Sequence, residues 1–351
     1  MPPPSESGLP ELTARPPAAA RWGGPVDVAV IVVNWNSGAM LDRCLRALAA
    51  QTVRPSRVIV VDNGSSDGSA DRLEARFPGV EVLRLGENVG FAAANNRAAA
   101  AARGIRWLAL LNPDAFPEPG WLAALLEAAD AHAGYSFFAS RMVRADDPAR
   151  LDGAGDVYYV NGLAARRGHG RPTPAREEPH EVFAACAAAA LYRADEFDAV
   201  SGFDERFFCY FEDVDLAFRL RLRGARCLYV PRAAVHHVGS GTTGARSDFT
   251  VYHGHRNLVW TFFKDMPGPL LVFYLPQHLL LNAVTLAVFA GRGQLRTIVR
   301  AKWDALRRLP AIWSDRRRVQ RTRTVSARAV RRAMAGGLLR PYRDGLGRPR
   351  R

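Results

Sequence analysis

The first third of the chain alternates short apolar runs with segments whose apolar residues recur at helical spacing. The apolar runs are rich in Val, Ile and Leu and cover residues 28–33, 57–61, 80–85 and 105–111. The segments between them cover residues 39–50, 68–77 and 91–103, the last rich in alanine. Strand-like runs that are apolar on both faces and alternate with helices predict a mostly parallel sheet covered by helices on each side.

Each of these apolar runs ends in a polar cluster. The clusters are Asn34-Trp35-Asn36, Asp62-Asn63-Gly64, Asn88-Val89-Gly90 and Asn112-Pro113-Asp114. Parallel sheets bind ligands beyond the carboxyl ends of their strands, where all four clusters are expected to meet. Taken singly, Asp62 and Asp114 are also ordinary turn residues, so the pattern alone leaves both readings open.

Metal binding is one function that Asp114 could serve. A single carboxylate together with phosphate oxygens suffices for Mg²⁺, which keeps several waters. Mn²⁺ also accepts an imidazole, and His236 and His237 follow a later apolar run. Adjacent residues of a strand point to opposite faces, so at most one of these histidines is expected to be a ligand. For either histidine alone, a packing role is the alternative.

The second half of the chain is less regular. Residues 144–181 are rich in Gly, Arg and Pro and predict a long loop or lid, whereas residues 186–193 predict a strand or a helix of small residues. Residues 202–224 predict a loop followed by a helix that ends at Gly224.

Three carboxylates, Glu212, Asp213 and Asp215, crowd the start of that helix. Mutual repulsion raises a carboxyl pKa and the helix dipole lowers it, so one of the three could serve as a base near neutrality. An aromatic cluster directly precedes them: Phe207, Phe208, Tyr210 and Phe211. An apolar wall beside carboxylates suits a sugar-binding site with a base, although acids also decorate helix starts without any such role.

The positive charge of the chain is confined to its C-terminal part. Residues 291–351 hold 18 Arg, one Lys and three Asp, a net charge of +16, so residues 1–290 carry about −2 of the total of +14. Such a tail is typical of a surface for phosphates, either anionic lipid or nucleic acid; a solvated tail is the alternative.

The apolar segment 267–290 precedes this tail and contains Pro276, Gln277, His278 and Asn282. It is only marginally long enough to cross a bilayer. We favour helices that lie in a membrane interface; a true span and a buried helix pair are the alternatives.

The N-terminal residues 1–25 are rich in Pro and small residues and lack the pattern of a secretory signal. We expect this segment to be disordered. The four cysteines are scattered without a CxxC pair, which favours a reducing compartment over a zinc site or a disulfide framework.

Seven motifs, in order, resemble the family 2 glycosyltransferases, especially their rhamnosyltransferase-like branch. The motifs are VVNWN (32–36), VVDNGSSDG (60–68), NVGFAAANN (88–96), LLNPDA (110–115), GFDERFFCYFEDVDLAFRLRLRG (202–224), HHVGSG (236–241) and YHGHRNL (252–258). The resemblance implies a GT-A fold over residues 26–265, with a nucleotide-binding parallel sheet and a smaller acceptor-side sheet. Residues 266–351 would then form a membrane-associating C-terminal region.

The resemblance also implies roles for individual residues. Asp213 would be the catalytic base, with Glu212 and Asp215 orienting the acceptor or the base. The nucleotide sugar would be bound by the polar clusters: Asn34, Asp62, Asn63, Asn88, Gly90, Asn95, Asn112 and Asp114. Asp114 matches the last acid of the family's DXD motif, whose first acid is replaced here by Asn112. Asp114 and His237 would hold Mg²⁺ or Mn²⁺, with His236 the less favoured ligand, and Arg256 and Asn257 match a pair without an assigned role.

The implied activity is an inverting, metal-dependent transfer of a sugar from a nucleotide-diphosphate donor. The donor would be a dTDP- or UDP-sugar, with rhamnose suggested by the branch, and the acceptor a glycan or polyprenyl-linked hydroxyl in cell-envelope polysaccharide synthesis. The enzyme would work peripherally at an anionic surface, the cytoplasmic face of the cell membrane. An inactive scaffold of this fold, and a nucleic-acid-binding protein using the Arg-rich tail, are the alternatives; the tail shows no nucleic-acid recognition pattern.

Overall fold

The computed structural model describes residues 23–239 and 247–336. The segment 1–25, expected to be disordered, therefore falls almost entirely outside the described residues, as do residues 337–351 of the Arg-rich tail.

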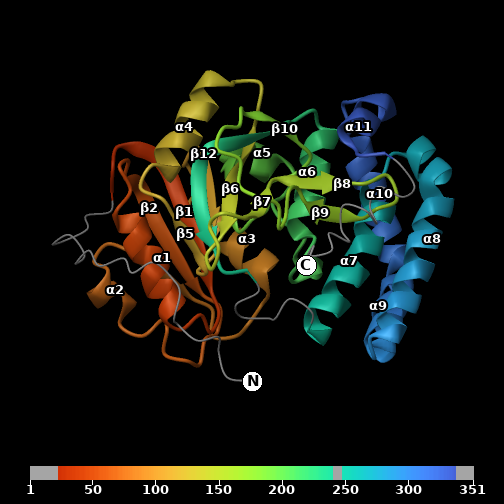
Figure 1. Ribbon diagram of the computed structural model, residues 1–351, viewed down its shortest axis with the longest axis horizontal. Coiled ribbons are helices and arrows are strands. Elements are labelled where there is room, and N and C mark those ends of the chain that lie inside the picture. The colour runs from red at the N-terminus through yellow and green to blue at the C-terminus, as the bar shows by residue number, and fades with distance from the viewer. Residues whose placement is uncertain (1–22, 240–246, 337–351) are drawn as a thin grey trace.

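A ten-stranded sheet forms the centre of the fold (Figure 1). The four apolar runs of the first third form its parallel part, in the order β3-β2-β1-β4: β1 (Val26–Asn34), β2 (Pro55–Asp62), β3 (Glu81–Arg84) and β4 (Trp107–Leu111). This confirms the predicted sheet and places the polar clusters at its carboxyl edge.

The remaining strands of the large sheet continue it beyond β4. They are β5 (Ala115–Pro117), β6 (Phe137–Arg144), β7 (Leu151–Ala154), β10 (His180–Val182), β11 (Ala189–Arg193) and β12 (Cys227–His237). β11 runs antiparallel between β4 and β6, and β12 runs parallel to β6. A separate two-stranded sheet is formed by β8 (Asp156–Tyr158) and β9 (Ala164–Arg166).

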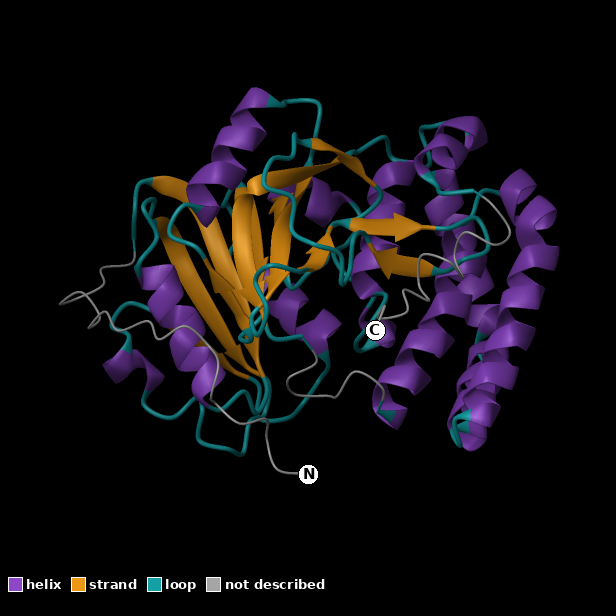
Figure 2. Cartoon of the chain, in the orientation of Figure 1, coloured by secondary structure: helices purple, strands orange, loops and turns teal. Residues whose placement is uncertain are grey.

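Helices cover both faces of the sheet, as Figure 2 shows. On one face Val28, Val30 and Val32 pack among residues of α1 (Ala39–Ala49) and α4 (Trp121–Ala131). On the other face Ala29 and Ile31 pack among residues of α3 (Phe91–Ala101) and α6 (Glu212–Leu222). Burial on both sides explains why β4 and the central residues of β1 and β2 are apolar without alternation.

Two predicted elements differ from the structure. The helix expected over 68–77 is reduced to α2 (Leu73–Arg76), because Gly68 and Arg72 both have positive φ and the Asp67 carboxylate accepts a hydrogen bond from the backbone N–H of Ser69. The loop expected over 144–181 contains β7, β8, β9 and β10, which are too short to give an apolar pattern. Residues 189–193 of the ambiguous segment 186–193 form a strand, followed by α5 (Ala194–Ala199) and the 3₁₀ turn η1 (Glu205–Phe207).

The C-terminal helices gather at one end of the molecule, far from α1 and α2 (Figure 1). They are α7 (Asp248–Asp265), α8 (Gly268–Gly291), α9 (Leu295–Arg307), α10 (Leu309–Arg321) and α11 (Ala327–Ala333). The segment 267–290 therefore forms one continuous helix with Pro276 inside it, not a buried helix pair. By length and composition α8 could cross a membrane, and 22% of its most apolar window is buried inside the protein.

Candidate active site

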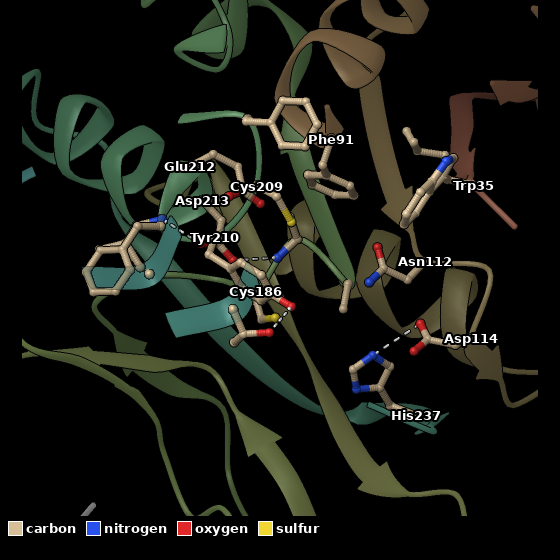
Figure 3. Close-up of a pocket in the computed structure, with 18 of the residues that line it drawn as sticks. Trp35, Phe91, Asn112, Asp114, Cys186, Cys209, Tyr210, Glu212, Asp213 and His237 are labelled. Atoms are coloured by element: carbon tan, nitrogen blue, oxygen red, sulfur yellow. Dashed lines mark hydrogen bonds and ion pairs between the residues drawn. The ribbon is translucent and has the colours of Figure 1, made fainter. Parts of the chain in front are cut away.

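A cavity of about 400 Å³ opens at the carboxyl edge of the sheet (Figure 3). Seven of the predicted site residues line it: Asn63, Asn88, Asn112, Asp114, Glu212, Asp213 and His237. Asn34, Asp62, Gly90, Asn95 and Asp215 are absent from its lining. The topology thus brings together residues from positions 63 to 237 of the chain.

The loops that follow β1, β2 and β3 are locked to one another by side-chain amides. Asn34 Nδ2 donates to Ser65 Oγ and Ser69 Oγ at 3.0 and 2.9 Å, and Asp62 accepts from the Ser65 backbone N–H at 3.0 Å. Asn63 Nδ2 donates to Asn88 Oδ1 at 2.9 Å. Asn34 and Asp62 therefore shape this edge of the cavity without facing it.

Gly90 joins this edge to the aromatic wall. It has φ of 88°, and a Cβ at this position would lie 2.5 Å from the ring of Phe208. Only glycine allows this conformation together with such close packing. Asn95, one helical turn further on, donates its amide to the carbonyl of Phe91 inside α3. Gly90 thus allows the aromatic wall to pack closely, whereas Asn95 is bonded within its own helix.

Asp114 and His237 meet on one side of the cavity (Figure 3). β12 pairs with β5 so that His237 stands opposite Ala115, which brings its Nε2 to 3.4 Å from Asp114 Oδ1. His236 points to the other face and lies 3.4 Å from Glu118. The Nδ1 of His237 contacts Asp152 Oδ2 at 2.7 Å, a partner that fixes the orientation of the ring.

The two groups strongly perturb each other's protonation. Burial opposes charge on Asp114, but the neighbouring His237 outweighs burial and the pKa of Asp114 is lowered. Burial likewise opposes charge on His237, but Asp114 and Asp152 raise its pKa to about 9. The metal-free pair is therefore an ion pair at neutral pH.

The same geometry fits a divalent cation. Although His237 Nε2 lies 3.4 Å from Asp114 Oδ1, neither this nitrogen nor the buried Asn112 Oδ1 makes a hydrogen bond with a described residue. Two adjacent ligands of an octahedral ion with bonds of ~2.1 Å lie roughly 3 Å apart, close to the separation of His237 Nε2 and Asp114 Oδ1. Carboxylate and imidazole together suit Mn²⁺.

Asp156, Cys186 and Asp213 form another group whose potential ligand atoms lie within 4.8 Å of one another. Mg²⁺ and Mn²⁺ prefer carboxylate oxygens, and Mn²⁺ also accepts imidazole, whereas a thiolate selects softer metals, so Cys186 is a poor ligand for either ion. The pair of Asp114 and His237 is therefore the better metal site.

Asp213 lies across the cavity from Asp114, beside Glu212 (Figure 3). Its two carboxylate oxygens accept from the backbone N–H groups of Ala187 and Val214 at 3.1 and 2.8 Å. Burial raises the pKa of Asp213 above its ordinary value although these hydrogen bonds oppose the shift. Burial, and then the charge of Asp213, also raise the pKa values of Glu212 and Asp156. A carboxylate with a raised pKa is a stronger base than one in water.

A strained loop aims Asp213 into the cavity. Phe208, Tyr210 and Phe211 all have φ between 65° and 67°, a region that bulky residues rarely adopt. Asn257 on α7 holds this loop, because its Nδ2 lies within 3.0 Å of the carbonyls of Phe207, Cys209 and Tyr210. 

The neighbouring Arg256 supports the same loop by donating to the Phe207 carbonyl at 3.0 Å. Arg256 and Asn257, the pair to which the sequence assigned no role, thus hold the loop behind the base Asp213. Sequence spacing does not reveal this function.

The position of Asp215 differs from the one expected from the sequence. Asp215 was expected to orient the acceptor or the base, but its side chain is fully buried away from the cavity and pairs with Arg219 and Lys264. Residues two apart on a helix do not share a face, so Asp213 and Asp215 point in different directions. Asp215 fastens α6 to α7 instead.

Three polar residues of this region were missed in the sequence: Asp152, Asp156 and Arg166. Asp156 and Arg166 line the cavity, and Asp152 lies beneath His237. They come from strands of three or four residues inside the Gly- and Arg-rich segment, where no periodic pattern marks them.

Comparison with known proteins gives consistent results. The profile of the family described as "Glycosyl transferase family 2" matches residues 29–200. The chain is 34% identical over 267 residues to the N-acetylglucosaminyl-diphospho-decaprenol L-rhamnosyltransferase of Mycobacterium tuberculosis, covering 67% of this chain and 83% of that protein. It is 33% identical over 228 residues to the pre-mycofactocin glycosyltransferase of the same species, covering 64% of this chain and 44% of that protein.

Solved structures share the fold at low identity. GalNAc-T7 with UDP, GalNAc and Mn²⁺ matches with a TM-score of 0.57 and 16% identity, over 72% of this chain and 49% of that chain. A mannosyltransferase from Pyrobaculum calidifontis with GDP-Man and Mn²⁺ matches with a TM-score of 0.50 and 16% identity, over 87% of both chains.

Proposed function

Because this chain belongs to glycosyltransferase family 2 and has a GT-A fold, we propose that it is an inverting, metal-dependent rhamnosyltransferase. The donor is a nucleotide-diphosphate sugar and the acceptor a lipid-linked glycan hydroxyl. The rhamnosyl and lipid-linked parts of the proposal rest on the name of the 34% identical relative.

One observation carries the proposal: Asp114 with His237, and Asp213 with Glu212, stand on opposite sides of the same cavity (Figure 3). A displacement at the anomeric carbon needs a base on the acceptor side and stabilisation of the leaving diphosphate on the donor side. The cavity offers both and needs no nucleophile from the protein.

The residues divide the reaction between them. Asn63 and Asn88, held together at the carboxyl ends of β2 and β3, border the nucleotide, and Asn34 and Asp62 keep their loop in shape. Asp213 takes the proton of the acceptor hydroxyl as that oxygen attacks the anomeric carbon. Asp114 and His237 would hold the divalent cation, which supplies Lewis-acid stabilisation of the leaving diphosphate.

Release of nucleoside diphosphate from a donor panel tests this function. The panel comprises dTDP-rhamnose, UDP-sugars and GDP-sugars, each with and without Mn²⁺. We expect Mn²⁺-dependent release from dTDP-rhamnose above that from the other donors. Release from a UDP- or GDP-sugar instead would keep the transferase and overturn the rhamnosyl assignment.

The C-terminal helices support a peripheral position on an anionic membrane. One side of α8 packs against the rest of the protein. Its buried residues recur at helical spacing: Leu271, Tyr274, His278 and Leu281. We call the outward side chains of α8 and α9 the apolar stripe: Val272, Phe273, Leu279, Leu280, Leu295, Val299, Trp303 and Leu306, each 46–73% exposed. Exposed arginines on α9 and the Arg-rich tail complement anionic headgroups.

Charging the apolar stripe should therefore release the enzyme from lipid. We expect Val299→Asp with Trp303→Asp to lower binding to phosphatidylglycerol vesicles by at least about tenfold, since burying one large apolar side chain contributes roughly 1.5–3 kcal/mol. Vesicle co-sedimentation measures the effect, and Ala131→Asp on the exposed end of α4 is the matched control. Unchanged sedimentation of the double variant would contradict a docking role for the stripe.

A further inference from the structure

Arg166 projects into the cavity from a part of the fold to which neither the motifs nor the comparisons assign a function. It is the last residue of β9 and the cross-strand partner of Asp156, and both line the cavity. Its Nη1 pairs with Asp152 Oδ2, the same oxygen that contacts His237 Nδ1 at 2.7 Å. Arg166 therefore stands beside the Asp114–His237 pair, one carboxylate away.

The stem of Arg166 packs against Gly153 of β7. A Cβ at Gly153 would lie 3.4 Å from Cβ and Cδ of Arg166 and 3.1 Å from Cε of Met142. The stem of Arg166 thus packs over a residue without a side chain, while the side chain remains 34% exposed on the cavity side.

Among its described residues, the cavity lining contains more carboxyl groups than cationic side chains. The described lining contains four carboxyl groups, on Asp114, Asp156, Glu212 and Asp213, and only two cations, Arg166 and His237. His237 is taken by Asp114 and Asp152. A diphosphate entering this cavity meets repulsion from the carboxylate of Asp114 and from Asp213 when it is ionised as the base, and among the described lining residues Arg166 is the fixed cation that can offset it.

We propose that the Arg166 guanidinium binds the diphosphate of the donor nucleotide, beside the ion held by Asp114 and His237. Asp152 engages one nitrogen of the guanidinium, and the planar fork of five N–H donors leaves others for phosphate oxygens. This inference rests on the proposed function. By its name, the acceptor of the 34% identical relative also carries a diphosphate. We assign Arg166 to the donor diphosphate because it shares an oxygen of Asp152 with His237. Its cross-strand partner Asp156 nevertheless lies beside Asp213, so the acceptor KM distinguishes the two diphosphates.

Nucleotide binding to the full chain tests the assignment. Calorimetry with dTDP, UDP and GDP in MnCl₂ first identifies the diphosphate that the wild-type protein binds best. Arg166→Gln should weaken binding of that diphosphate by about 10- to 100-fold and leave the Kd of the corresponding nucleoside monophosphate within about twofold. Arg166→Lys, which keeps the charge but loses the fork, should lie in between.

Two controls separate binding from a purely structural role. The KM for the lipid-linked acceptor should stay unchanged in Arg166→Gln, and so should Mn²⁺ binding without nucleotide, measured by electron paramagnetic resonance. An unchanged diphosphate affinity, a defect confined to the acceptor KM, or a parallel loss of Mn²⁺ binding would each overturn the inference. Failure of the wild-type protein to bind any of the three diphosphates would instead refute the proposed function.

Discussion

Replacing Asp213 by Asn is expected to lower the rate of sugar transfer by at least about 10²–10⁴-fold, the contribution of a well-placed general base. The amide cannot take the proton of the acceptor hydroxyl. It nevertheless keeps one oxygen for the Ala187 or Val214 N–H, so the fold of the loop should survive. Transfer rates at saturating donor measure the effect, and nucleoside diphosphate affinity should stay within about twofold of wild type.

Asp195→Asn is the matched control for this prediction. Asp195→Asn is the same chemical substitution, but Asp195 is exposed at the start of α5 and lies outside the cavity. If Asp213→Asn transferred sugar at the wild-type rate and Glu212→Gln were slow, the base would be assigned to Glu212 instead. A pH profile adds a signature, because the raised pKa of Asp213 places the acidic loss of activity at a higher pH than an ordinary aspartic acid would.

Removing both ligands of the proposed metal site is expected to abolish Mn²⁺-dependent transfer. The double variant Asp114→Ala with His237→Ala lacks both side chains that would hold the ion. Mn²⁺ affinity, followed by electron paramagnetic resonance in the presence of nucleoside diphosphate, should fall beyond detection. His236→Ala, the neighbouring histidine that faces away, is the control and should bind Mn²⁺ normally.

A graded effect should accompany this loss. Asp152→Asn removes the carboxylate that orients His237 and should weaken Mn²⁺ by about 10–100-fold, the usual effect of losing such a partner. Full Mn²⁺ affinity in the double variant would contradict the assignment of Asp114 and His237. Equal loss in His236→Ala would point to general disruption of β12.

The parallel half of the sheet could be predicted because the central residues of β1, β2 and β4 are buried on both faces and thus form unbroken apolar runs, whereas β3 lies at the exposed edge. The rule about carboxyl ends placed Asp114 at this edge of the sheet, and the family resemblance implied that Asp213 and His237 join it in one site. The structure confirms the fold class, and the comparisons confirm the family.

Other features depend on geometry that a linear pattern does not record. Asp215 was grouped with Asp213 because they are close in sequence, whereas the helical turn sends their side chains apart. The position of Arg166 depends on pairing within a short hairpin, and that of Asp152 on the register of β6 with β7. For α8, hydropathy alone could not separate a spanning helix from one docked along the protein, because only packing shows which side is covered.

The alternatives of an inactive scaffold and a nucleic-acid-binding protein have no support from the comparisons, which identify an enzyme family. Within that family, the identity of donor and acceptor is the central claim, and it can be measured directly.

The most direct measurement is transfer of labelled rhamnose from dTDP-L-rhamnose to an N-acetylglucosaminyl-diphospho-polyprenol. The wild-type protein with Mn²⁺ should convert the lipid into a labelled product of inverted anomeric configuration, assigned by nuclear magnetic resonance. Omission of Mn²⁺ and the Asp213→Asn variant should both abolish the product. Absence of labelled lipid from the wild-type protein, or equal product from Asp213→Asn, would contradict the proposal.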